Sequence, residues 1–220
     1  MADQASKWIL NFHGIGRIAR PFDPGEESVW VSVDQFREIL DSIVDDSTVK
    51  ITFDDGNVSD LAIAVPELAS RKLSATFFIP AGKIGAPGFL RPQDVESIAV
   101  AGMGIGSHGW AHRPWRRLDR ESAHLEFVES KRLLEEITST TVDLAACPFG
   151  AYDRSTIRAL VAAGYRRAYT SDRGWSLNRS FLEPRNTVHS DSDASSVLAE
   201  RAASRNSIFN VVKQAVKRWR

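Results

Sequence analysis

The chain has 220 residues and carries equal numbers of basic and acidic side chains, 28 of each. This length allows one domain or two small ones. The ordinary shares of hydrophobic (43%) and charged (25%) residues exclude disorder, collagen and coiled coil. The balanced charge argues against a general nucleic-acid binder, which would normally show a basic excess. Cys147 is the single cysteine, so the chain contains no disulfide framework.

The polar segment 1–7 shows no apolar run after a basic region, so we expect no signal peptide. No apolar stretch approaches the roughly 18 residues that a membrane-spanning helix needs. A cytoplasmic location is expected on these grounds.

Short apolar runs alternate along the chain with longer amphipathic ones. Strands are predicted at residues 8–12, 49–53, 75–79, 103–105, 144–147, 167–170 and 182–188. Helices are predicted at residues 33–44, 61–70 (distorted at Pro66), 94–101, 121–137, 155–163, 192–203 and 208–219. This repeated alternation is typical of a parallel α/β fold.

Polar residues recur directly after the predicted strands, where parallel sheets and barrels carry their active sites. Several such clusters converging on one rim favour a barrel over an open sheet. Because the chain is short for eight βα units, we expect a distorted, incomplete (β/α) barrel of seven to eight units. The barrel domain is predicted to span residues 1–205.

A basic amphipathic helix is predicted over residues 206–220, where Lys213, Lys217 and Arg218 alternate with apolar residues. We interpret it as a docked terminal helix with a solvated face. Weak contact with an anionic membrane surface is the alternative, which would place the protein at the inner membrane face.

Asp54-Asp55-Gly56 follows a predicted strand. Two adjacent carboxylates point in different directions there, so one can bind a metal while the other acts as a base, and Gly56 permits a sharp turn. A plain turn with a helix cap is the alternative. His108 and His112 are spaced so that two imidazoles reach one ion, although alone they also fit ordinary surface histidines. Together with Asp55 they make three protein ligands, the number typical of a hydrolytic metal site.

Further candidates lie at other strand ends. Pro148-Phe149-Gly150 either presents a backbone N–H to an oxyanion or forms a simple strand-to-helix turn. His189 fits a general acid or a surface histidine, and His13 fits a pocket-lining or a structural role. Arg185 is a candidate ion-pair partner for a rim carboxylate. Trp175 is a candidate sugar-stacking or core residue.

Taken together, these residues resemble the polysaccharide deacetylase family, also called the NodB-homology or carbohydrate esterase family 4 domain. The resemblance runs from about residue 9 to residue 189. The first motif is matched by residues 52–56, the second by His108 and His112, and the third by the Pro148–Gly150 turn. The fourth and fifth motifs resemble residues 172–175 and 188–189. Segments 10–15 and 182–186 resemble an exopolysaccharide-associated bacterial branch.

The resemblance implies an incomplete barrel of the NodB-homology type and a role for each residue. Asp54 would be the catalytic base and His189 the catalytic acid, with the Phe149 N–H facing the oxyanion. One divalent metal, Zn²⁺ with Co²⁺ or Ni²⁺ as alternatives, would be held by Asp55, His108 and His112. The substrate side would be lined by a second group of residues, namely Pro148, Gly150, Trp175, Arg185 and His13.

Four positions depart from the family pattern. Gly109 stands where Ser or Thr is common, and Thr187 stands where Leu is usual. Ala146 replaces the third-motif Arg that orients the catalytic carboxylate, and Arg185 is a candidate replacement from another strand. Gly174 replaces the second Asp of the fourth motif.

The expected function is metal-dependent removal of acetyl groups, in particular N-acetyl groups, from an acetylated oligosaccharide or glycan. Two alternatives stay open. One is an amidohydrolase acting on a small non-sugar amide. The other is a catalytically weak glycan-binding module, which the replaced third-motif Arg and altered fourth motif would suit.

Overall fold

Nine short strands form one sheet in the computed structural model, which describes residues 6–176 and 180–204. The strands are β1 (Lys7–Phe12), β2 (Val49–Asp54), β3 (Ala75–Ile79), β4 (Gly104–Ser107), β5 (Leu144–Ala146), β6 (Arg167–Thr170), β7 (Trp175–Ser176), β8 (Leu182–Pro184) and β9 (Asn186–Thr187). The sheet order is β7-β1-β2-β3-β4-β5-β6-β8, and β9 pairs with β1. All neighbours are parallel except β1 and β7.

The two edges of the sheet are brought together by one stretch of chain. β8 pairs with β6, whereas β9, which begins two residues after β8 ends, pairs with β1. Arg185 lies between the two strands and donates its backbone N–H to the Thr170 carbonyl at 2.9 Å. The sheet is therefore a nearly closed barrel with one unsealed seam, which confirms the expected distorted and incomplete barrel.

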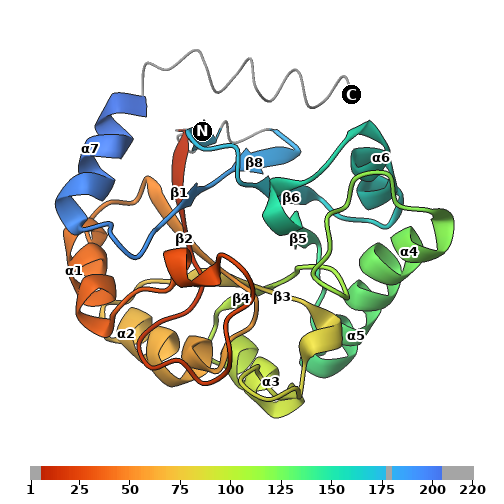
Figure 1. Ribbon diagram of the computed structural model, residues 1–220, viewed down its shortest axis with the longest axis horizontal. Helices are drawn as coiled ribbons and strands as arrows, with labels where there is room; N and C mark the ends of the chain where they lie inside the picture. Colours follow the sequence, from red (N-terminus) through yellow and green to blue (C-terminus); the bar gives the residue numbers. More distant parts are fainter. Residues whose placement is uncertain (1–5, 177–179, 205–220) are drawn as a thin grey trace.

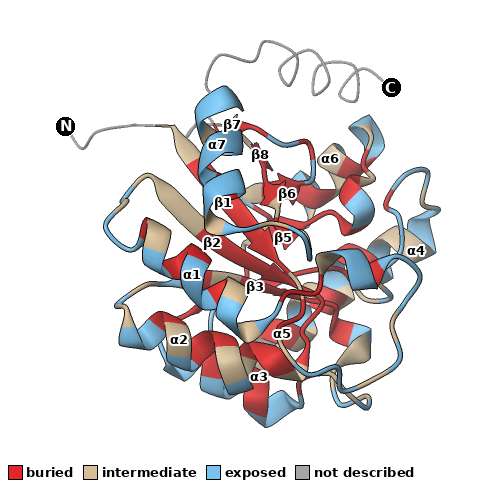
Figure 2. Cartoon of the chain, turned by 60° about the vertical axis from the view of Figure 1, so that its left-hand side comes forward, coloured by how far each residue is buried: buried red, intermediate tan, exposed pale blue. Residues whose placement is uncertain are grey.

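Helices surround the barrel on its outside (Figure 1). They are α1 (Val33–Ile43), α2 (Val65–Ser70), α3 (Pro92–Val100), α4 (Arg120–His124), α5 (Ser130–Thr138), α6 (Arg154–Ala162) and α7 (Ala194–Ser204). Figure 2 shows buried strands at the centre and helices whose outward faces are exposed. No described helix is long and apolar enough to cross a membrane.

Alternating side chains separate the two faces of the strands. On β1, Trp8, Leu10 and Phe12 belong to the apolar layer between sheet and helices, whereas Ile9 packs inside the barrel with Phe78. Because successive residues of a strand point to opposite faces, Asn11 also points inward. The barrel interior thus receives polar side chains near the carboxyl ends of its strands.

Two predicted helices are interrupted by π-helical turns. The helix expected at 61–70 begins as a π-turn, Asp60–Ala64, and continues as α2, in which Pro66 cannot donate a backbone N–H. The helix expected at 121–137 contains a π-turn, Leu125–Glu129, between α4 and α5. The strand expected at 182–188 is divided into β8 and β9, and β7 was not predicted. The helix expected at 206–220 lies outside the described residues.

Candidate active site

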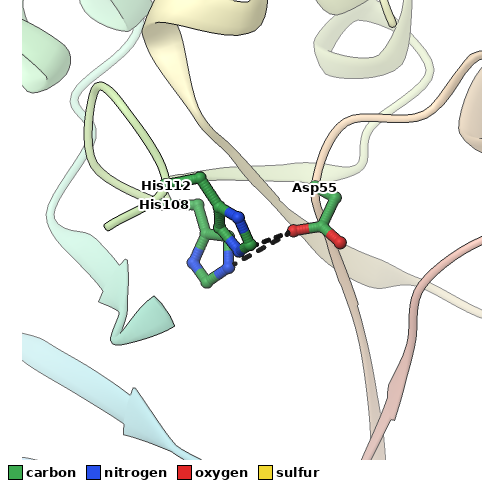
Figure 3. A group of neighbouring side chains, drawn as sticks. All are labelled: Asp55, His108 and His112. Atoms are coloured by element: carbon green, nitrogen blue, oxygen red, sulfur yellow. Dashed lines mark ion pairs between the residues drawn. The ribbon is translucent and has the colours of Figure 1, made fainter. Parts of the chain in front are cut away.

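Asp55, His108 and His112 meet at the carboxyl ends of β2 and β4. One ligand atom from each lies within 4.8 Å of the other two. The Asp55 Oδ1 atom lies 3.1 Å from His112 Nε2 and 3.5 Å from His108 Nε2 (Figure 3). This Oδ1 is buried and has no hydrogen-bond partner among the described residues. A carboxylate oxygen and two imidazole nitrogens are donors that suit Zn²⁺ and related divalent ions, so the three residues fit a metal.

The ring of His108 is fixed by the strand next to it. Its Nδ1 lies 2.8 Å from the carbonyl oxygen of Ala146 at the end of β5. Since a carbonyl only accepts hydrogen bonds, Nδ1 carries the proton and Nε2 is left as a ligand. Burial is the main cause that lowers the pKa of His108 to about 4, so the imidazole is neutral at physiological pH.

This lowered pKa predicts how the stability of the metal-free protein depends on pH. An unfolded histidine titrates near pH 6.5, so between pH 6.5 and 4 the unfolded chain binds the extra proton. Stability should therefore fall as the pH falls through this window, on the order of 3 kcal/mol from His108 alone. Buried Asp60 acts in the opposite sense, since burial and the charges of Asp55 and Asp54 raise its pKa well above the ordinary value.

Urea unfolding of chelator-treated wild type and His108→Asn at several pH values isolates the histidine contribution, because Asp60 is common to both proteins. The wild type should show the steeper loss of unfolding free energy below pH 6.5. Equal slopes in the two proteins would contradict the prediction.

Backbone strain is concentrated at this rim. Asp55 and His112 both have positive φ values, 76° and 51°. Such conformations cost about 1–3 kcal/mol for residues other than glycine and cluster at functional sites. Gly56, with φ 66°, completes the sharp turn that separates the two carboxylates.

A buried carboxylate, Glu126, holds the loop that carries the two histidines. Its oxygens accept hydrogen bonds from the backbone N–H groups of Trp110 at 2.9 Å and Ala111 at 3.1 Å, and from the indole of Trp115 at 3.2 Å. Glu126 lies in the π-turn between α4 and α5 and is 1% exposed. Sequence reasoning missed it, because one glutamate within a helical pattern carries no visible signal.

The same carboxylate accounts for the departure at Gly109. A Cβ at this position would lie 2.2 Å from Glu126 Oε2, and the φ of 77° disfavours other residues. The N–H of Gly109 donates instead to Ser107 Oγ at 3.1 Å. The loop is therefore shaped around Glu126.

Asp54 is held by a buried guanidinium. Arg185 Nη1 and Nη2 each lie 2.7 Å from one Asp54 oxygen, and Asn11 Nδ2 donates to Oδ2 at 3.0 Å. Despite its complete burial, Asp54 has a pKa far below the ordinary value, chiefly because of the Arg185 charge. Arg185 is 1% exposed, and its Nη1 also donates to Asn11 Oδ1 at 2.7 Å. It thus reaches a site carboxylate from the junction between β8 and β9, not from β5.

The two other candidate site histidines, His13 and His189, lie at the same end of the barrel. His13 Nε2 is 4.0 Å from Asp54 Oδ2. Asn11 of β1 is paired with Thr187 of β9. If this parallel register is continued by two residues, His189 lies beside His13. His189 Nε2 lies 3.4 Å from Arg173 Nη2.

The Pro148–Gly150 turn is a short 3-10 helix after β5. Phe149 has a φ of 57° and a side chain that is 67% exposed. Its ring centroid lies 4.7 Å from that of His112, so the turn borders the candidate metal ligands. Cys147, which precedes the turn, is buried.

Trp175 is not brought to this group of residues. It pairs with Trp8 near the amino end of β1, and the two rings are 5.6 Å apart. Its indole packs with the apolar layer on the outside of the barrel, where Arg201 of α7 lies over it. The structure places it in the core between sheet and helix, away from Asp55 and the histidines.

Comparisons with known sequences identify relatives of this chain. The polysaccharide deacetylase family model matches residues 41–168. The curated protein named "Putative polysaccharide deacetylase YxkH" of Bacillus subtilis is 29% identical over 57% of this chain and 45% of its own length, so the chain spans less than half of this relative.

Solved structures share the fold over most of the chain. Streptococcus pyogenes deacetylase PplD, solved with acetate, has a TM-score of 0.79 at 19% identity and covers 90% of this chain and 99% of its own. IcaB from Ammonifex degensii has a TM-score of 0.71 at 20% identity, covering 89% and 96%. A polysaccharide deacetylase from Bacillus cereus has a TM-score of 0.78 at 19% identity, covering 89% and 69%. The chain therefore belongs to the polysaccharide deacetylase family.

Proposed function

We propose that this protein is a metal-dependent hydrolase that removes N-acetyl groups from an acetylated oligosaccharide or glycan. One observation carries the proposal. Two buried residues and the half-buried His112 form a metal-ligand set beside a carboxylate that is held in its ionised form, on the fold of the polysaccharide deacetylase family. A structural ion site would have no need for the second carboxylate at this place.

Asp55, His108 and His112 would hold the ion, with Zn²⁺ as the preferred choice and Co²⁺ or Ni²⁺ as alternatives. When bound there, a divalent ion polarises the acetyl carbonyl and lowers the pKa of a water molecule. His108 suits this role because its ligand nitrogen is unprotonated and its ring is fixed by the Ala146 carbonyl.

Asp54 serves as the general base. An ionised carboxylate offers about four acceptor positions, and Arg185 and Asn11 occupy three of them. The remaining position accepts the proton of the attacking water. The strongly lowered pKa keeps Asp54 ready to accept across the physiological range, although it also makes the carboxylate a weak base in water.

Two further groups complete the reaction. The backbone N–H of Phe149 donates to the oxyanion that forms on the acetyl carbonyl, since the Phe149 ring already lies against His112. His189 donates a proton to the departing amine, with His13 lining the pocket between it and Asp54. Pro148 and Gly150 shape the turn that presents the N–H.

The exposed Phe149 ring beside the site offers an apolar face for a sugar ring, which favours a carbohydrate over a small amide. The Bacillus cereus protein that shares this fold is likewise a polysaccharide deacetylase. Segments 10–15 and 182–186 resemble an exopolysaccharide-associated branch of the family, and this resemblance supports an exopolysaccharide as the substrate.

Metal content and acetate release test the proposal together. Native mass spectrometry should find one ion per wild-type chain after Zn²⁺ is supplied and none in His108→Ala. Acetate should be released from N-acetylglucosamine oligomers by wild type only. If wild type binds no ion, the protein is better explained as a glycan-binding module. If it binds metal but releases acetate from no sugar, the amidohydrolase alternative is favoured.

A further inference from the structure

Unpaired arginines are gathered in one part of the molecule. Among the described residues, the arginines that form no ion pair come from segments 113–120 and 154–158, with Arg17 as the one exception. Arg113, Arg116 and Arg117, here called the arginine rim, are all exposed. Because most of the other described arginines are paired with carboxylates, this concentration of arginines without an ion pair stands out on a chain of zero net charge. The Arg113 guanidinium donates a hydrogen bond to the Ser122 hydroxyl at 3.1 Å, which leaves its charge without a carboxylate partner among the described residues.

The arginine rim borders the active site. Arg113 directly follows the ligand His112. Arg116 Nε donates to the Tyr152 carbonyl at 3.1 Å, and the N–H of Arg117 donates to Asp153 Oδ2 at 3.0 Å. These bonds fasten the rim to the chain segment that follows the Phe149 turn. A glycan extending from the metal ligands over the Phe149 ring would therefore pass the rim.

Two acidic side chains near the arginine rim, Asp119 and Asp153, are already engaged as helix caps. Asp153 caps α6 and accepts hydrogen bonds from Ser155 and Thr156 as well as from Arg117. Asp119 caps α4 through Ser122. Neither forms an ion pair with the rim arginines within 4.0 Å among the described residues. Arg117 also has a φ of 55°, a strained conformation of the kind that clusters at ligand sites.

We propose that the arginine rim binds an anionic group, a carboxylate or a phosphate, on the glycan that is deacetylated. The planar guanidinium offers paired donors that match both oxyanions in a bidentate manner. The rim would thus select an acetylated chain that carries a uronate or a phosphate near the sugar at the metal. This inference rests on the proposed function for the identity of the substrate.

Three forms of one oligosaccharide test the rim: the neutral N-acetylglucosamine trimer, the trimer with a 6-phosphate, and the trimer with its C6 oxidised to a carboxylate. Calorimetry with zinc-loaded Asp54→Asn measures binding without turnover, and acetate release by wild type gives kcat/KM. At low salt, at least one charged trimer should be preferred, and the charged form that wins identifies the anion. The preference should shrink at 0.5 M salt because exposed charges are screened.

Arg117→Gln should lower the charged-to-neutral ratio by about threefold, and Arg113→Gln/Arg117→Gln by about tenfold. Lys72→Gln is the matched control, since Lys72 is an exposed cation with a φ of 57° in the turn before β3, at the opposite end of the barrel. Metal content verifies that each variant keeps its site.

Equal binding of all three trimers by zinc-loaded Asp54→Asn would overturn the rim while leaving the proposed function in place. An equal drop in the charged-to-neutral ratio in Lys72→Gln would overturn the rim as well. So would binding to phosphatidylglycerol vesicles that depends on the rim arginines, if the trimers themselves are bound without preference. Preferential binding of a charged trimer without acetate release from any form would refute the proposed function and leave the rim standing.

Discussion

Replacing Asp54 by Asn is expected to slow acetate release by about a hundredfold to ten thousandfold, the range typical of a general base, while metal stays bound. The amide cannot take a proton from water. In wild type each Asp54 oxygen accepts a hydrogen bond from Arg185, whereas in the variant the amide NH₂ group would bring a donor against one of these Arg185 donors. The metal ligands are untouched by the change. Acetate release and zinc content of the same preparation measure both effects.

Loss of activity together with loss of zinc would show that Asp54 supports the metal site and would remove the assignment as base. Asn11→Asp is a useful comparison, because it leaves Asp54 intact and alters the neighbour that donates to it.

The orientation of Asp54 by Arg185 yields a related expectation. Arg185→Lys keeps the charge, but an ammonium group cannot bridge both carboxylate oxygens as the guanidinium does. We expect kcat to fall by at least about tenfold with little change in KM. A variant that changes only KM would instead place Arg185 in contact with substrate, the second of the two roles expected from the sequence, besides that of an ion-pair partner.

The second large effect is expected from Glu126→Ala. The variant leaves the N–H groups of Trp110 and Ala111 and the Trp115 indole without their acceptor, at about 1–3 kcal/mol for each group that stays buried. The loop between His108 and His112 then loses its fixed shape. Zinc affinity should fall by about tenfold to a hundredfold, as is usual when the support of a metal ligand is removed.

Competition with a chromophoric chelator measures the affinity, and urea unfolding of the metal-free protein measures the stability. Glu129→Gln is the matched control, because Glu129 lies in the same π-turn but pairs at the surface with Arg132. Unchanged zinc affinity in Glu126→Ala would limit Glu126 to a purely structural role.

The regular elements and the metal ligands could be predicted from the sequence for physical reasons. Continuous apolar runs such as 75–79 have the length and composition of a buried strand, and β3 spans those same residues. Since carboxyl ends of parallel strands share one rim, Asp55 and His108 could be expected together although 52 positions separate them. The π-turns left no such trace, because one inserted residue barely changes the apolar spacing of a helix.

Long-range contacts of single side chains could not be read in the same way. Glu126 is an ordinary helix-forming residue in the sequence, and only the fold brings it under the loop between His108 and His112. Trp175 was expected at a pocket wall, yet the antiparallel pairing of β7 with the start of β1 puts its ring outside the barrel. Such pairings depend on where the chain turns back, which local patterns do not encode.

The division of the last strand into β8 and β9 also governs the order in which the site is assembled. Arg185 reaches Asp54 only when β8 has joined β6 and β9 has joined β1, a pairing between residues about 175 positions apart. Contacts so distant in sequence cost the most chain entropy and tend to form late. Any stretch of this chain that stops before Leu182 has its metal ligands but no guanidinium to orient the base. Under the proposed function, Asp54 would therefore gain its orienting partner only at the end of folding, when the barrel closes.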